Sequence, residues 1–313
     1  IRRISTICHA NIAHIEEHPR FHLHYADLSD TLSLMNLISK VRPHEIYNLA
    51  AQSHVQVSFD CLEYTANIDA LGILRILEIV RNCGLTNSCK IYQASTSELY
   101  GNTHIIPQNE NTPFHPCSPY GIAKMYGHRI VREYREAYNM FCCSGIMFNH
   151  ESEHRGETFV TRKITLASSR IAQGKQDKLH LGNLSAKRDW GYAKDNVECM
   201  WLMLQNENPE DFVIATGEQH SVRDFCKLAF HYAGIELQFI GDGLNEKGVN
   251  AKTGEIIVEV SKDLFRPTDV FNLLGDPTRA IDKLGWQPQK TSFDELVGLM
   301  VQADMANVQK NQI

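Results

Sequence analysis

Tyr120 and Lys124, four residues apart in the sequence, form a pair that could carry acid–base chemistry. The segment from Ser118 to Tyr138 is predicted to be helical, and residues i and i+4 of a helix lie one turn apart on the same face. A free tyrosine has a pKa of about 10 and is a poor base at neutral pH, but a fixed ammonium nearby favours the phenolate. The pair could then accept a proton from a hydroxyl group while a hydride leaves the same carbon. An ordinary exposed helix can carry the same spacing, so the pair alone does not identify an active site.

Polar residues that follow a predicted strand upstream strengthen this interpretation. The strand predicted over residues 89–94 is followed directly by Ser95, Thr96, Ser97 and Glu98. Thr96 could form a hydrogen bond with the reacting oxygen, and Glu98 adds a carboxyl group at the same strand end. A helix cap or a salt bridge would explain one of these residues, but not the combination with the tyrosine and the lysine.

Four motifs together resemble the extended short-chain dehydrogenase/reductases that act on nucleotide sugars and, among them, the GDP-mannose 4,6-dehydratase family. They are Ser-Thr-Ser-Glu-Leu-Tyr-Gly at 95–101, Ser-Pro-Tyr-x-x-x-Lys at 118–124, Phe-Asn-His-Glu-Ser at 148–152 and Arg-Gly-Glu-Thr-Phe-Val-Thr-Arg-Lys at 155–163. The resemblance extends from Asp27 to about Trp286. It implies a lyase that acts on GDP-mannose, with Thr96, Glu98, Tyr120 and Lys124 as the catalytic residues.

The resemblance also implies how these groups would act. Tyr120 would deprotonate the 4-hydroxyl group of the mannose while a hydride passes from C4 to NADP⁺. Glu98 would then remove the C5 proton and help to expel the C6 hydroxyl group as water, and the hydride would return to C6. A 4-keto sugar reductase and a C4 epimerase are the alternatives within the family, and neither needs a base for C5.

Cofactor contacts are also implied by the resemblance, one position at a time. They are Arg2, Arg3, Asp27, Leu28, Leu49, Ala50, Ala51, Gln52, Ser53, Tyr64, Lys124, His150 and Arg155. A guanidinium group binds phosphate through two parallel hydrogen bonds, so Arg2 and Arg3 favour NADP over NAD.

Five further residues are implied for the nucleotide sugar: Asn149, Glu157, Lys163, Arg188 and Arg266. Cations suit a diphosphate, and Arg188 is expected in a loop over the nucleotide. The alternative for each arginine is a surface ion pair, which stabilises a fold by only ~0–1 kcal/mol.

Two features depart from the family or could mislead. The family begins with a strand and a Gly-x-x-Gly-x-x-Gly turn for the pyrophosphate, whereas this sequence begins beyond that point. We expect that the sequence is incomplete at its N-terminus, and that the 313 residues bind NADP weakly. Residues 150–154 match the His-Glu-x-x-His pattern of zinc proteases, but that pattern works on a helix and here it follows a strand, so we expect no metal.

The elements that must position these residues alternate between strand and helix. Strands are predicted over 21–25, 45–50, 89–94 and 142–148, and helices over 32–41, 64–83 and 118–138. This order predicts an α/β fold with a doubly wound, Rossmann-like parallel sheet, in which ligands bind at the carboxyl ends of the strands. We expect an NADP-binding domain over 1–150, to which segments such as 194–220 return, and a smaller mixed α/β lobe over 151–313 that binds the nucleotide sugar. In that lobe, helices are predicted near 160–173, 194–206, 221–234 and 292–305, and strands at 178–181, 211–215, 236–240 and 255–260.

Composition narrows the class of protein. A net charge of −6 is a poor match for a nucleic-acid-binding protein, and no apolar stretch is long enough for a membrane span. Nine cysteines, an odd number, without a Cys-x-x-Cys pair favour reduced thiols in the cytoplasm. The resemblance implies a homodimer or homotetramer. A catalytically silent binding protein with the same fold is the alternative from a different class.

Overall fold

The computed structural model describes residues 1–2, 11–264 and 272–310. Their contacts divide the chain into two compact units. The first comprises Ile1–Gly101, Pro113–Ile146 and Met200–Phe212, and the second comprises Asn102–Thr112, Met147–Cys199 and Val213–Ile313. The second unit is the larger by residue count, because Asn102–Thr112 and the whole C-terminal stretch belong to it.

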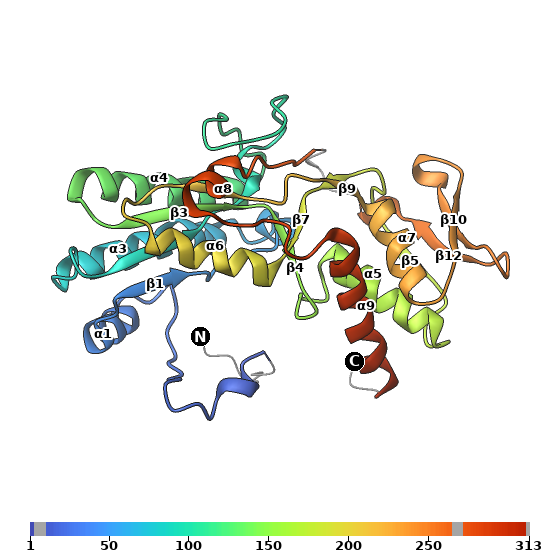
Figure 1. The fold of residues 1–313 in the computed structure, drawn as a ribbon, viewed down its shortest axis with the longest axis horizontal. Coiled ribbons are helices and arrows are strands. Elements are labelled where there is room, and N and C mark those ends of the chain that lie inside the picture. Colours follow the sequence, from blue (N-terminus) through green and yellow to red (C-terminus); the bar gives the residue numbers. More distant parts are fainter. Residues whose placement is uncertain (3–10, 265–271, 311–313) are drawn as a thin grey trace. The chain divides into compact units, whose positions relative to one another are not determined.

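A parallel sheet is the centre of the first unit (Figure 1). The strands of the sheet lie in the order β1 (Glu45–Asn48), β2 (Lys90–Ala94), β3 (Cys142–Met147) and β8 (Phe212–Ile214), of which β8 has only Phe212 in the first unit. β1 pairs with β2, and β2 with β3, in parallel register. The helices are α1 (Thr31–Val41), α2 (Leu62–Thr65), α3 (Leu71–Asn82) and α4 (Pro119–Tyr138). The predicted α/β fold class is therefore confirmed.

Apolar faces of α1, α3 and α4 pack with β2 and β3 in one core. Ile73, Leu77 and Ile91 are almost fully buried in this core. α6 (Ala193–Gln205) contributes its last residues to the same unit, where Lys90 Nζ donates to the Leu204 carbonyl oxygen at 2.6 Å. Burial of such side chains stabilises the fold by about 1.5–3 kcal/mol each, which fixes the strand ends that carry the polar residues.

The helix predicted over 64–83 contains an irregular turn. α2 and α3 are joined by η3 (Ala66–Ala70), a π-helical turn that buries Ile68 and Asp69. Such turns insert one residue into a helix and often occur at functional sites. The apolar periodicity predicted the helix but not this change of pitch.

The strand predicted over 21–25 is wrong. Residues 21–27 have no regular secondary structure. This segment forms backbone hydrogen bonds with Ile1 instead. Ala26 N donates to the Ile1 carbonyl oxygen, and the Ile1 amino group donates to the His24 carbonyl oxygen. Alternating apolar residues form a strand only where a neighbouring strand supplies hydrogen bonds.

The second unit is built on a mixed sheet in the order β10 (Leu237–Ile240), β11 (Lys247–Asn250), β12 (Ile256–Val260) and β5 (Leu179–Leu181). Its core also includes α5 (Val160–Ala172), α7 (Val222–Tyr232) and α9 (Phe293–Gln309). Short pairs that the sequence did not predict are β4 (Asn149–Glu151) with β7 (Trp190–Tyr192), and β6 (Lys187–Arg188) with β9 (His220–Ser221). The short helix α8 (Thr278–Leu284) was not predicted either.

Candidate active site

The N-terminus of α4 is fixed by residues directly before Tyr120. Ser118 is the N-cap, and its Oγ accepts a hydrogen bond from Gly121 N at 3.0 Å. Pro119 occupies the first helical position, where its fixed φ and missing N–H cost nothing. Tyr120 and Lys124 therefore lie one turn apart in the first two turns of the helix, and both are buried.

Lys124 is held in place by the end of β2. Its Nζ donates to the Ala94 carbonyl oxygen at 2.6 Å. Burial lowers the pKa of Lys124, because removal from water disfavours the charged form, and the charge of Asp69 opposes this shift. An ammonium group in this position stabilises a phenolate on the tyrosine one turn away.

Thr96 and Glu98 lie just beyond the same strand. Thr96 Oγ1 accepts a hydrogen bond from Glu98 N at 3.2 Å and caps η4 (Ser97–Leu99), a single 3₁₀ turn. η4 packs on the start of α4, where a Cβ added to Gly121 would stand 3.1 Å from the Glu98 carbonyl oxygen. The predicted catalytic residues Thr96, Glu98, Tyr120 and Lys124 are thus brought to one end of the parallel sheet, from β2, η4 and α4.

Buried polar groups that were not predicted support this strand end. Asn48 Nδ2 donates to Gln93 Oε1 at 2.7 Å, and Gln93 Nε2 donates to the Ala94 carbonyl oxygen at 2.9 Å. His128 Nδ1 lies 3.2 Å from Ser95 Oγ, and burial lowers the pKa of His128 to about 4. Two sequence signals could have found these residues. Asn48 and Gln93 are polar residues within apolar strands, and His128 lies one turn after Lys124 on the same face of α4.

Two of the predicted cofactor segments, residues 27–28 and 49–53, belong to the first unit. Asp27 accepts hydrogen bonds from Ser29 N at 2.8 Å and Ser29 Oγ at 2.7 Å, which lower the pKa of Asp27. Arg75 Nη1 donates to the Leu28 carbonyl oxygen at 2.8 Å. The segment Leu49, Ala50, Ala51, Gln52 and Ser53 directly follows β1.

Arg2 and Tyr64 lie together, because Arg2 Nη1 donates to the Tyr64 hydroxyl group. Tyr64 is 40% exposed on α2, and the charge of Arg2 also helps to lower the pKa of Asp27. Arg3 lies outside the described residues. The guanidinium group of Arg2 therefore lies beside Tyr64 and Asp27, which are two of the other predicted cofactor residues.

His150, Asn149 and Arg155 belong to the second unit. Asn149 and His150 are on β4, and His150 Nδ1 lies 2.9 Å from the Phe148 carbonyl oxygen. Arg155 stacks on the Phe159 ring, with its Cζ 3.6 Å from the ring centroid, and forms an ion pair with the buried Glu151 at 3.1 Å. The His-Glu-x-x-His pattern lies on a strand and a turn, so its two histidines do not share a helix face.

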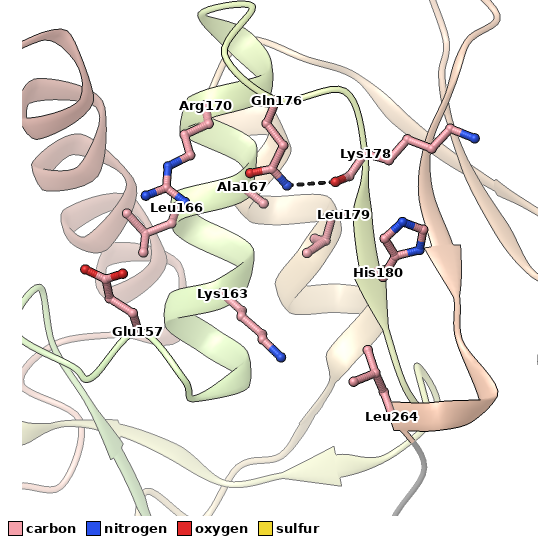
Figure 2. Close-up of a pocket in the computed structure, with 10 residues that line it drawn as sticks. All are labelled: Glu157, Lys163, Leu166, Ala167, Arg170, Gln176, Lys178, Leu179, His180 and Leu264. Carbon is pink, nitrogen blue, oxygen red and sulfur yellow. Dashed lines mark hydrogen bonds between the residues drawn. The ribbon is translucent and has the colours of Figure 1, made fainter. Parts of the chain in front are cut away.

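A pocket in the second unit contains two of the predicted substrate residues, Glu157 and Lys163 (Figure 2). Its volume is about 330 Å³, and Lys163, Arg170, Lys178 and His180 give it basic walls. Lys178 is paired with Glu259 at 3.0 Å. The remaining lining residues are Leu166, Ala167, Gln176, Leu179 and Leu264. The pocket can hold a polar anionic group beside an apolar surface.

Arg188 is buried at the end of β6, and the next residue fixes the loop that carries it. Asp189 Oδ1 accepts hydrogen bonds from Thr216 N at 2.8 Å and Thr216 Oγ1 at 2.7 Å. Asp189 Oδ2 accepts from Gly217 N at 3.0 Å and Gly275 N at 3.4 Å. Burial raises the pKa of Asp189 to about 6. Arg266 lies outside the described residues.

The residues that the structure describes contain no group of three or more His, Cys, Asp or Glu side chains placed to hold a metal ion. No helix within them combines the length and the apolar character that a bilayer crossing requires.

Comparison with known proteins identifies close relatives. The family model described as GDP-mannose 4,6 dehydratase matches residues 1–300. Curated proteins named GDP-mannose 4,6 dehydratase are 53% identical in Drosophila melanogaster, over 100% of this chain and 80% of the relative, and 52% identical in Homo sapiens, over 99% and 85%.

Solved structures share the fold at much lower identity. The dTDP-glucose 4,6-dehydratase DesIV from Streptomyces venezuelae, solved with NAD and TYD bound, has a TM-score of 0.81 at 20% identity, covering 97% of this chain and 85% of that one. RMD from Pseudomonas aeruginosa, complexed with NADPH, has a TM-score of 0.76 at 20% identity, covering 90% and 88%.

Proposed function

Because the chain belongs to the GDP-mannose 4,6-dehydratase family, we propose that it converts GDP-mannose to GDP-4-keto-6-deoxy-mannose by eliminating water across C5 and C6. The observation that carries this proposal is the set of Thr96, Glu98, Tyr120 and Lys124 at the carboxyl end of β2, with the lysine buried and bonded to the strand. Family membership supports the substrate, and the residue types support the chemistry.

The residues of this chain have separate tasks. Tyr120, as a phenolate beside the Lys124 ammonium, takes the proton of the 4-hydroxyl group. The Thr96 hydroxyl group, whose oxygen accepts from Glu98 N, donates a hydrogen bond to the same sugar oxygen and keeps its own proton. Once C4 is a ketone, the C5 proton is acidic, and Glu98 removes it and delivers it to the departing C6 oxygen, so that one water leaves. A nicotinamide nucleotide, when bound, would supply the acceptor for the C4 hydride and its return to C6, and a solvent proton at C5 would complete the product, so that no net oxidation would occur.

The cofactor is a nicotinamide nucleotide, and NADP in particular. The segment after β1 follows the carboxyl end of a strand, which is where an open α/β sheet binds its ligands, and Arg2, beside Tyr64 and Asp27, suits the 2′-phosphate. Arg3, Leu28, the segment 49–53, Tyr64, His150 and Arg155 complete the proposed contacts. Comparing the Michaelis constants for NADP⁺ and NAD⁺ in the wild type and in Arg2→Ala tests this: loss of the arginine should weaken NADP⁺ more than NAD⁺. Equal effects on both would reject the NADP preference.

The nucleotide part of the substrate is assigned to residues of the second unit. Lys163 and Glu157 line the pocket of Figure 2, and Arg188 is held by the Asp189 anchor on the same unit. Basic side chains suit a diphosphate. Asn149 and Arg266 remain predictions for the same role.

A homo-oligomer in the cytoplasm is also proposed. Ile122 and Tyr126, one turn apart on α4, are 54% and 41% exposed, which suits a helix face that a second copy covers. The described cysteines form no disulfide bond, which suits a reducing compartment. Light scattering of the wild type and of Ile122→Lys tests the assembly; a wild-type monomer would reject it.

Incubation of the protein with GDP-mannose and NADP⁺ tests the activity. Loss of GDP-mannose with formation of a 6-deoxy-4-keto product and without net NADPH is the expected result. Stoichiometric NADPH would indicate an oxidoreductase, and a C4 epimer alone would indicate an epimerase. Binding of both ligands without turnover would indicate a silent binding protein.

A further inference from the structure

Asp69 is a buried carboxyl group in the π-helical turn η3, and the reaction described above gives it no task. It is 3% exposed, and its neighbours Ile68 and Ala70 are apolar and buried. A carboxylate is rarely buried unless it is paired or hydrogen-bonded. Its place in an otherwise apolar helix stripe therefore requires an explanation.

One oxygen of Asp69 holds the segment that follows β1. Oδ1 accepts a hydrogen bond from Gln52 N at 2.7 Å. The Gln52 side chain donates to the His54 carbonyl oxygen and to Thr65 Oγ1, each at 3.2 Å, so the segment is also tied to α2. Asp69 is thus bonded to the middle of the proposed cofactor segment 49–53.

The other oxygen has no hydrogen-bond partner within the described residues. Burial raises the pKa of Asp69 to about 6, and the charge of Lys124 opposes that shift. Gly127 makes this approach possible. A Cβ on Gly127 would stand 3.0 Å from the Asp69 carbonyl oxygen, so glycine allows η3 and α4 to come into backbone contact. Residues 124 and 127 lie on the same face of α4, three positions apart.

Several charged or titratable groups lie on the elements packed around Lys124. Asp69 on η3 is the charge that counters the effect of burial on the lysine. His128 on α4 is uncharged at neutral pH, because burial lowers its pKa to about 4. Arg75 is bonded to Leu28 and Asn67, and Glu78 to Arg81 and Tyr134. The remaining titratable groups on α2, β2, η4 and α4 are Glu63, Tyr64, Lys90, Tyr92, Glu98, Tyr120, Tyr126, Arg129, Arg132, Glu133, Arg135, Glu136 and Tyr138.

We propose that Asp69 is a positioning residue that keeps Lys124 charged inside the protein and ties the catalytic lysine to the cofactor segment 49–53. The inference rests on the proposed function for its catalytic meaning. A neutral lysine could no longer favour the Tyr120 phenolate. Loss of the Asp69 carboxylate would therefore weaken Tyr120 as a base, because Lys124 would lose its charge.

The variant Asp69→Asn tests this, because it removes the charge but keeps an oxygen that can accept from Gln52 N. The first readout is the titration of Lys124 itself, followed by NMR in protein with ¹³C-labelled lysine. The Lys124 signal is identified by its loss in Lys124→Arg. We expect the pKa of Lys124 to fall by about 1–3 units, the usual effect of removing a nearby opposite charge.

The second readout is the pH profile of kcat. Because activity requires protonated Lys124, the alkaline limb should move toward neutral pH by a similar amount in Asp69→Asn. Glu110→Gln is the matched control: Glu110 is a partly buried carboxylate whose Oε1 accepts from Val213 N at 2.8 Å, and glutamine retains that oxygen. Its alkaline limb should stay in place.

An unchanged Lys124 titration in Asp69→Asn overturns the proposal, as does a kcat that falls equally at every pH. If the asparagine variant does not fold, Asp69→Ser, which also loses the charge and keeps an acceptor, must give the same shift. If the wild type forms no keto sugar, the proposed function fails, and the lysine titration still decides the role of Asp69.

Discussion

Gly127 on α4 lies directly against the backbone of Asp69 on η3. A Cβ at Gly127 would stand 3.0 Å from the Asp69 carbonyl oxygen and 3.3 Å from Ile73 Cγ2. The first of these neighbours is backbone, which cannot rotate away as a flexible side chain could. η3 and α4 can therefore come this close only because residue 127 is a glycine.

Gly127→Ala should lower both stability and activity. The added methyl group gains up to ~1 kcal/mol of helix propensity, but crowding in a packed interior costs about 1–3 kcal/mol, so the variant is expected to be less stable by ~1 kcal/mol. Displacement of Asp69 should also reduce kcat. Denaturant unfolding and kcat measure the two effects, with the exposed helical position Asn36→Ala as the control. A variant as stable and as active as the wild type would show that η3 and α4 need not touch.

Glu98→Gln should leave the fold intact and slow dehydration severely. General acid–base catalysis by one side chain contributes about 10²- to 10⁴-fold to a rate, and glutamine cannot accept the C5 proton. Product formation should fall by that factor, and the entry of deuterium from solvent at C5 should fall with it. Tyr120→Phe is the comparison, because it should block the earlier oxidation at C4. If Glu98→Gln forms the 6-deoxy product at a near-normal rate, the assignment of the C5 proton to Glu98 is wrong.

Asp189→Ala should weaken substrate binding more than it slows the reaction. The carboxylate satisfies donors on Thr216, Gly217 and Gly275, and each buried unsatisfied donor costs about 1–3 kcal/mol. We expect a loss of about 3 kcal/mol or more in unfolding free energy and a raised KM for GDP-mannose, because the loop that carries Arg188 loses its anchor.

Glu295→Ala is the control for Asp189→Ala. Glu295 accepts from Ser292 N and Ser292 Oγ, each at 2.8 Å, in the capping box of α9. Its loss should cost about 1 kcal/mol without a change in KM. A KM that rises equally in both variants would mean that general destabilisation, and not the Arg188 loop, is responsible.

His128 should make the protein less stable as the solution becomes acidic. Burial lowers its pKa from 6.5 to about 4, so the unfolded chain binds the proton more readily than the folded protein does. The stability that depends on neutral His128 is complete above pH 6.5 and is lost as the pH falls toward 4, by about 3 kcal/mol at most. His128→Gln should flatten the pH dependence of unfolding in that window, whereas the exposed His22→Gln should not. A slope that persists in His128→Gln would assign the acid sensitivity to other groups.

The sequence by itself determined the fold class and most of the elements. Apolar periodicity predicted α1, α4 and α9 to within a few residues, because each long helix must bury a continuous stripe. Local chemistry also determined the start of α4, where Ser118 and Pro119 are good N-terminal residues. Reactive groups such as Tyr120, Lys124 and Glu98 were found because their types and spacing are read directly from the chain.

Only the tertiary structure decided which groups support the reactive ones. Asp69 joins Gln52 and Lys124 across segments far apart in the sequence, and no local pattern specifies that approach. The same is true of Asp189 with Gly275, and of residues 21–25, whose alternation predicted a strand that found no partner. The physical reason is that hydrogen bonds and charge interactions over long sequence distances depend on how the packed elements meet, whereas periodicity reports only which face of an element is buried.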